Sequence, residues 1–158
     1  MNIDPIAMAK LISPFVTLII GIIIEKLSER RAKLISFIGH VSSFTLNNEE
    51  KTPVFTHSII VRNTGRKTAN NVRLGHNVMP VNVTVSPKIE YQIKEFQGGG
   101  SEIVIPTMVP KEQITISYLY FPPITWDQIN TYTKSDEGFA KIVNLERLLN
   151  LLLNKEAT

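Results

Sequence analysis

Residues 113–120 read QITISYLY, and this short stretch carries the clearest structural signal in the chain. Ile114, Ile116, Tyr118 and Tyr120 alternate with mostly polar positions, so one face of an extended segment is apolar. A repeat of two residues is typical of a strand with one buried face. The stretch therefore predicts a half-buried strand in an antiparallel sheet.

Six more segments of the same character precede this strand, each rich in Val, Ile, Thr, Tyr or Phe. They lie at 34–46, 55–62, 71–78, 81–85, 91–96 and 102–106. Turn residues separate them, at Asn47-Asn48, Thr64-Gly65, Gly98–Gly100 and Pro110-Lys111. Short strands at roughly ten-residue spacing with turns between them are typical of a sandwich or barrel. We therefore predict an all-β domain over residues 34–143, built as an antiparallel β-sandwich.

Two of these segments carry a resemblance to a known class of module. Residues 61–74 read VRNTGRKTANNVRL, and residues 105–120 read IPTMVPKEQITISYLY. The first is similar to a hairpin, and the second to a later turn and strand, of bacterial immunoglobulin-like, adhesion-type β-sandwich modules. Lys111 stands where those modules usually have glycine. The resemblance speaks to the fold and carries no function of its own.

This resemblance implies roles for several residues of the first segment. Asn63 and Gly65 would make the turn of a hairpin that pairs 55–62 with 71–78. Ala69 would lie beneath that turn. Val72 and Leu74 would point into the sandwich.

The N-terminal part of the chain has a different pattern. After a short tail at 1–5, residues 6–24 read IAMAKLISPFVTLIIGIII and contain one charge, at Lys10. About 20 apolar residues in a helix cross a hydrocarbon core roughly 30 Å thick. A signal peptide, a buried soluble helix and an interfacial helix are the alternatives, and each fits less well. We therefore predict a transmembrane helix over 6–25.

Basic residues follow this apolar run directly, in the juxtamembrane segment 26–33. They are Lys26, Arg30, Arg31 and Lys33. Basic residues collect on the cytoplasmic side of a span. The pattern predicts a single-pass protein of the inner (cytoplasmic) membrane, with its N-terminus outside and its C-terminal domain in the cytosol.

The C-terminal residues 144–158 return to a helical repeat. The sequence NLERLLNLLL spaces its leucines three and four residues apart, as in an amphipathic helix too short to span a bilayer. These leucines are Leu145, Leu148, Leu149, Leu152 and Leu153. Docking on the sandwich, lying on the membrane and self-association are all open for this stripe. We expect it to contribute to a homo-oligomer.

Motifs for catalysis and for cofactor binding are weak. The chain has no cysteine, so a disulfide framework, a thiolate zinc site and a thiol nucleophile are excluded. Its three histidines, His40, His57 and His76, lack metal-type spacing to carboxylates. We find no nucleophile elbow, phosphate-binding loop or H-E-x-x-H motif. We expect a protein that is not an enzyme and that uses no cofactor or metal.

The most conspicuous charge pattern lies between Lys51 and Lys88, where the chain contains no Asp or Glu. If 55–62 and 71–78 pair, the basic side chains of this run converge at one edge. They are Arg62, Arg66, Lys67, Arg73, His57 and His76. A local positive field attracts anions such as nucleotides or lipid headgroups. A solvated face without a ligand is the alternative interpretation.

Two hypotheses about function follow. In the first, the cytosolic sandwich is a non-enzymatic binding or sensor module that recognises an anionic ligand or a protein partner at the membrane. In the second, the chain is a defence effector. Its layout is similar to that of bacterial antiviral membrane effectors, including CRISPR-associated ones. That similarity implies binding of a cyclic oligonucleotide, followed by perturbation of the bilayer.

Overall fold

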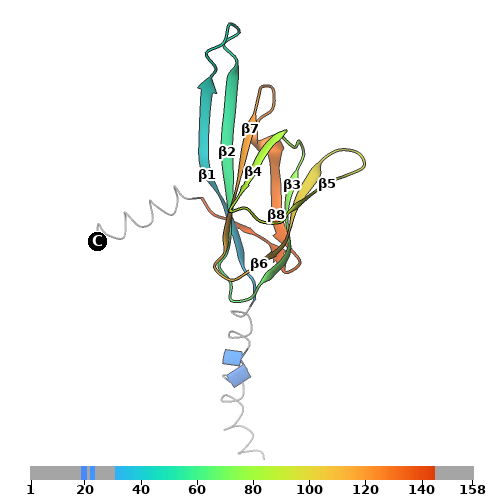
Figure 1. The fold of residues 1–158 in the computed structure, drawn as a ribbon. Coiled ribbons are helices and arrows are strands. Elements are labelled where there is room, and N and C mark those ends of the chain that lie inside the picture. The colour runs from blue at the N-terminus through green and yellow to red at the C-terminus, as the bar shows by residue number, and fades with distance from the viewer. Residues whose placement is uncertain (1–18, 21, 24–30, 145–158) are drawn as a thin grey trace, which may run out of the picture. The chain divides into compact units, whose positions relative to one another are not determined.

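The computed structural model describes residues 19–20, 22–23 and 31–144, shown in colour in Figure 1. The chain divides into two units, Met1–Arg31 and Ala32–Thr158. Within the described residues, no helix is both long and apolar enough to cross a membrane. The predicted span at 6–25, most of its basic flank and the predicted C-terminal leucine helix lie largely outside these residues. Those predictions therefore stay predictions.

The second unit contains a two-sheet β-sandwich with almost no helix. Its elements are β1 (Leu34–Thr45), β2 (Pro53–Asn63), β3 (Ala69–His76), β4 (Asn82–Ser86), β5 (Gln92–Glu95), β6 (Ser101–Met108), β7 (Gln113–Tyr120), α2 (Trp126–Ile129), β8 (Asn130–Ser135), β9 (Gly138–Phe139) and β10 (Lys141–Ile142). One sheet has the order β10-β1-β2-β7-β4, and the other has the order β5-β6-β3-β8-β9. The all-β sandwich predicted from the sequence is confirmed.

Seven of these strands, β1 to β7, coincide with the seven predicted segments to within a few residues. The last part of the domain, from α2 to β10, was not predicted from the sequence. There the strands are short, and β9 and β10 have two residues each. Residues 138–142 run from one sheet to the other, because β9 pairs with β8 and β10 pairs in parallel with β1.

The core lies between the inner faces of the two sheets. Alternate residues of β7, which begin at Ile114 and Ile116, are buried, as the period-two pattern predicts. They face the inner side of the second sheet, where Ala69, Val72 and Leu74 are at most 1% exposed. The inward positions implied for Val72 and Leu74 are therefore confirmed.

The predicted pairing of 55–62 with 71–78 is wrong. β2 pairs with β1 and β7, whereas β3 pairs with β6 and β8 in the other sheet. Residues 64–68 are therefore a crossover between sheets. The Asn63 side chain holds this corner, because it is fully buried and makes four hydrogen bonds. Its Oδ1 accepts from the N–H groups of Lys33 and Gly65, and its Nδ2 donates to the carbonyls of Lys67 and Met108.

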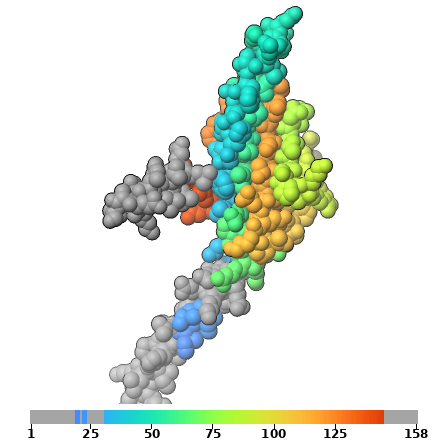
Figure 2. Space-filling model, turned by 60° about the vertical axis from the view of Figure 1, so that its left-hand side comes forward, coloured from blue at the N-terminus to red at the C-terminus, as the bar shows by residue number. Residues whose placement is uncertain are grey.

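The β1–β2 hairpin is much longer than the sheet that faces it. Eleven pairs join the two strands, with a bulge between Ile38 and His40. Beyond the bulge, β1 residues 40–43 still lie opposite β2 residues that pair with β7, and only the end of the hairpin projects past the rest of the sandwich (Figures 1 and 2). On β1, Leu34 and Ser36 are buried, whereas Val41 and Phe44 are 62% and 59% exposed. The hairpin thus has a packed base and a projecting half.

Candidate functional site

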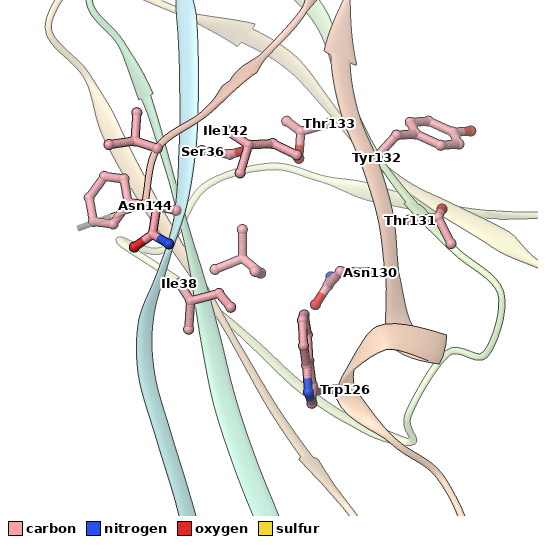
Figure 3. Close-up of a pocket in the computed structure, with 12 residues that line it drawn as sticks. Ser36, Ile38, Trp126, Asn130, Thr131, Tyr132, Thr133, Ile142 and Asn144 are labelled. Atoms are coloured by element: carbon pink, nitrogen blue, oxygen red, sulfur yellow. The ribbon is translucent and has the colours of Figure 1, made fainter. Parts of the chain in front are cut away.

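A pocket of about 500 Å³ opens between the two sheets on the side where β1 faces β8. Twelve residues line it, and none of these is charged (Figure 3). They are Ser36, Phe37 and Ile38 of β1, Ile59 of β2, Trp126 of α2, Asn130, Thr131, Tyr132 and Thr133 of β8, and Ile142, Val143 and Asn144. A volume of 300–1,000 Å³ with mostly apolar walls and a few polar groups is usual for small-molecule sites.

The two sides of the pocket differ in chemistry. Ile38 and Ile142 line the side of the first sheet, together with the buried hydroxyl group of Ser36. Trp126 and Asn130 extend into the pocket from the opposite side, whereas the Tyr132 ring points away (Figure 3). A molecule in this pocket would therefore meet an indole ring, aliphatic groups, and hydroxyl and amide groups that can orient it.

A short capped helix positions Trp126. The backbone N–H of Thr125 donates to Oε1 of Gln128 at 3.1 Å, which satisfies a donor before the first turn. The backbone N–H of Val78 donates to the carbonyl of Gln128 at 3.1 Å and ties the helix to the loop after β3. Ile129 is fully buried and anchors the helix in the core. The Trp126 side chain is left half exposed at the mouth of the pocket.

The orientation of Tyr132 has a separate cause. Tyr132 lies beside Gly75 in the neighbouring strand, and a Cβ at Gly75 would collide with the Tyr132 ring. Its hydroxyl donates to the buried Glu102 carboxylate, whose Oε1 also lies 3.6 Å from Nζ of Lys134. Burial and the hydrogen bond to Glu102 together raise the pKa of Tyr132 to about 12. These contacts hold the ring on the outer face of its sheet.

Behind the pocket, Asn130 begins a chain of buried polar side chains. Nε2 of His57 lies 2.6 Å from Oδ1 of Asn130, and Nδ2 of Asn130 donates to the Tyr118 hydroxyl at 3.0 Å. That hydroxyl lies 2.7 Å from Nε2 of His76. The amide of Asn130 has a distinct donor and acceptor, so it determines which side chain donates in each of these hydrogen bonds. His57 donates to Asn130, Asn130 to Tyr118, and Tyr118 to His76.

His57 and His76, the two histidines of this hydrogen-bond network, are neutral in the folded protein at pH 7. Burial lowers the pKa of His57, and the hydrogen bond to Asn130 opposes this only in part. Burial also lowers the pKa of His76, to about 4. The His57 ring stacks on Tyr118 with a centroid separation of 4.8 Å. The group that lines the pocket, Asn130, is thus held by a network of neutral, packed rings.

The structure does not bring the six predicted anion-binding residues together. His57 and His76 are 1% and 3% exposed and belong to the core, so they cannot form part of an exposed basic edge. Arg73 lies on β3 and pairs with Asp136, with 3.2 Å between Nη2 and Oδ1. Arg62 is exposed on the other sheet. Arg66 and Lys67 are exposed in the crossover, where an anion-binding role stays a prediction.

Sequence reasoning missed the residues that line the pocket. Residues of β1 and β8 meet there although they lie far apart in the chain, so no local motif announces them. One local signal was available. Thr125 and Gln128 have the spacing of a capping box and mark the start of the helix that carries Trp126.

The fold and the pocket together define a two-sheet β-sandwich with a small-molecule-sized cavity at one open side. No protein-family model and no curated protein matches the chain. Among solved structures, the chain is similar to the chitin-binding domain of Chi18aC from Streptomyces coelicolor, determined in solution. The TM-score is 0.38 at 12% sequence identity, and the match covers 68% of this chain and 94% of that one.

Proposed function

We propose that the sandwich is a non-enzymatic binding module that takes a small, uncharged molecule into the pocket between β1 and β8. The observation that carries this proposal is that Trp126 and Asn130 both line a pocket that has no charged residue. An uncharged ligand fits such walls, because a charged one would lose its hydration without gaining a counter-ion. An apolar ligand face would lie on Trp126 and Ile38, and a polar group would bond to Asn130 or Thr133.

The neutral network behind Asn130 supports this assignment. Both ends of the Asn130 amide are already bonded, to His57 and to Tyr118, so the side chain has one orientation. A group held before the ligand arrives loses little conformational freedom on binding. Asn130 is therefore prepared to recognise a hydrogen-bonding group by its remaining donor or acceptor capacity.

Trp126 is the only tryptophan of the chain and provides the test. Water-soluble neutral fragments, both aromatic amides and polyols, are titrated into the full-length protein while Trp126 emission is recorded. Fragments that bind should shift the emission. Thr133→Val, which removes a pocket hydroxyl at similar volume, should weaken those that hydrogen-bond there by about tenfold. The matched control is Val81→Ala, since Val81 is 98% exposed and lies outside the pocket.

A second readout is needed for Trp126→Ala, which removes the fluorophore. Saturation-transfer NMR on the fragment should then show binding at least about tenfold weaker, as for loss of an aromatic anchor. Unchanged binding in this variant, or a fragment set that leaves the wild-type emission unmoved, would refute the pocket as the ligand site. Nucleotide binding that is lost in Arg66→Glu with Lys67→Glu would favour the anion-binding hypothesis instead.

We place this module at the inner membrane on the strength of the sequence. The apolar run 6–24 and the basic residues that follow it support a single span with the sandwich in the cytosol. A reporter enzyme that works only in the cytoplasm, fused after Thr158, should be active. Activity of a periplasmic reporter alone at that position would reverse the orientation.

A further inference from the structure

The projecting half of β1 has a free edge. On the side away from β2, β10 is the one described strand that pairs with β1, and it reaches only Ile35 and Ser36. The N–H of Val143 also donates to the carbonyl of Ser36. The ladder with β2 nevertheless continues to Thr45. Backbone N–H and C=O groups between Ile38 and Thr45 that point away from β2 therefore form a row available to another strand.

Apart from the bulge between Ile38 and His40, this edge lacks the features that keep edge strands apart. Natural edges are interrupted by lysines, prolines or inward-pointing charges. Residues 34–48 contain no Asp, Glu, Lys, Arg or Pro. Val41, Phe44 and Leu46 are 62%, 59% and 45% exposed along it. The segment thus has the composition of a strand that pairs on both sides.

Charges at the two ends of the hairpin identify the partner. The tip carries Glu49 and Glu50, both exposed, and its one lysine, Lys51, donates through Nζ to Oδ1 of Asn47. At the base, Arg62 and Lys141 flank Ile35 in one row across β2, β1 and β10. Two copies placed head to tail would bring each acidic tip to the basic base of the other.

We infer that two copies of this chain associate by antiparallel pairing of their β1 edges. When a two-fold axis relates two antiparallel strands, the residue at the axis lies opposite the same residue of the other copy. Residues opposite each other point to the same face of the sheet. The free run centres on Ser42. Pairing about Ser42 places His40 opposite Phe44 and brings Glu49 of one copy to the level of Ile35 of the other, where β10 ends the free edge and carries Lys141. The five-stranded sheets would then join into one continuous sheet.

The absence of cysteine allows a direct test in the full-length protein in native membranes. Ser42→Cys gives a single thiol on the proposed axis, and opposite Cα atoms in such a ladder are within disulfide range. Mild oxidation should cross-link this variant about tenfold faster than the control, as expected from the higher effective concentration in a dimer. The matched control is Thr84→Cys, which is exposed on β4 at the opposite edge of the same sheet.

A scan of single cysteines from His40 to Phe44 gives the orientation. Antiparallel pairing predicts one maximum, with less cross-linking on both sides. Parallel pairing would instead cross-link all positions alike. No position above the Thr84→Cys control would overturn the inference. A uniform profile would overturn the antiparallel geometry.

Charge reversal tests the contact between tip and base. Glu49→Lys with Glu50→Lys should weaken dimerisation roughly tenfold, measured by mass photometry in detergent. Adding Arg62→Glu and Lys141→Glu should restore the dissociation constant to within about threefold of the wild type. Val41→Lys with Phe44→Lys should abolish the dimer, whereas Val81→Lys with Val109→Lys should not. A wild-type protein that stays monomeric, or a quadruple variant no tighter than the tip variant, would contradict the proposal.

Discussion

The base and the projecting half of the β1–β2 hairpin are made of similar residues in very different surroundings. At the base, Leu34 is buried against the facing sheet, and Asn63 is held by four hydrogen bonds. In the projecting half, Val41 and Phe44 are mostly exposed, and one side of β1 is unpaired. The comparison separates a base that is packed on both strands from a half in which β2 is still packed, through Val54 and His57, but β1 is largely exposed.

Removing the Asn63 side chain should have the largest effect on stability. Asn63→Ala removes the partner of two carbonyls and two N–H groups at the sheet crossover, of which the Met108 carbonyl and the Gly65 N–H are buried. Each such group costs about 1–3 kcal/mol when it stays buried. We expect the free energy of unfolding to fall by about 4 kcal/mol, since part of the corner can rehydrate. Chemical denaturation followed by Trp126 fluorescence measures this change. The control Asn82→Ala, at an exposed edge position, should cost less than 0.5 kcal/mol.

Acidification should have the next largest effect, through the histidines behind the pocket. The folded pKa of His76 is about 4, against 6.5 for a free histidine. The unfolded chain therefore binds more protons between these values, and stability falls as the pH is lowered from 6.5 towards 4. His76 alone accounts for about 3 kcal/mol over this window. His57, whose pKa is also lowered, acts in the same direction.

Thermal unfolding between pH 7.5 and 4.5 tests this prediction. His76→Gln can still accept from Tyr118 but cannot titrate, so its melting temperature should vary much less with pH than that of the wild type. His40→Gln, at an exposed histidine on β1, should keep the wild-type profile. The same steep profile in His76→Gln and the wild type would show that the network does not cause the pH dependence.

The positions of β1 to β7 were predictable because each segment is rich in Val, Ile, Thr, Tyr or Phe and lies between turn residues. Their pairing was not. A turn such as Asn63–Gly65 can join two paired strands or carry the chain to the other sheet. Here the chain crosses to the other sheet, and the Asn63 side chain holds the crossover by donating to the carbonyl of Met108, 45 residues away. A local pattern contains no information about such a contact.

The pocket and the buried histidines illustrate the same limit. His57 alternates with Ile59 and Val61, so its place on the inner face of β2 could have been read from the sequence. His76 alternates in the same way with Val72 and Leu74, because the extra residue of the bulge lies on β8. Neither pattern shows that Tyr118 and Asn130 join the two histidines. The charge pattern between Lys51 and Lys88 was real, but folding divided it between the core and two sheets.

A small gain in stability is expected at the turn before β7, which lies at the base near Asn63. Lys111 has a φ of 70°, which is unfavourable for a residue with a Cβ, and its N–H donates to the carbonyl of Asn63 at 2.8 Å. Lys111→Gly keeps that bond and removes the strain. We expect the protein to be more stable by about 1 kcal/mol. Lys111→Ala, which keeps a Cβ, should show no such gain in the same denaturation experiment.

The smallest effect is expected in the projecting half. Val41→Ser with Phe44→Ser removes apolar groups that are mostly in water already, so the monomer should lose less than about 0.5 kcal/mol. Leu34→Ser, at the base of the same strand, should cost about 3 kcal/mol.

The two halves of the hairpin are best compared by measuring the melting temperature at several protein concentrations. Association through β1 stabilises the wild type by mass action, so its melting temperature should rise with concentration. The Val41 and Phe44 variant should show the dilute wild-type value at every concentration. Equal dependence in both proteins would mean that this half of the hairpin contributes nothing to association.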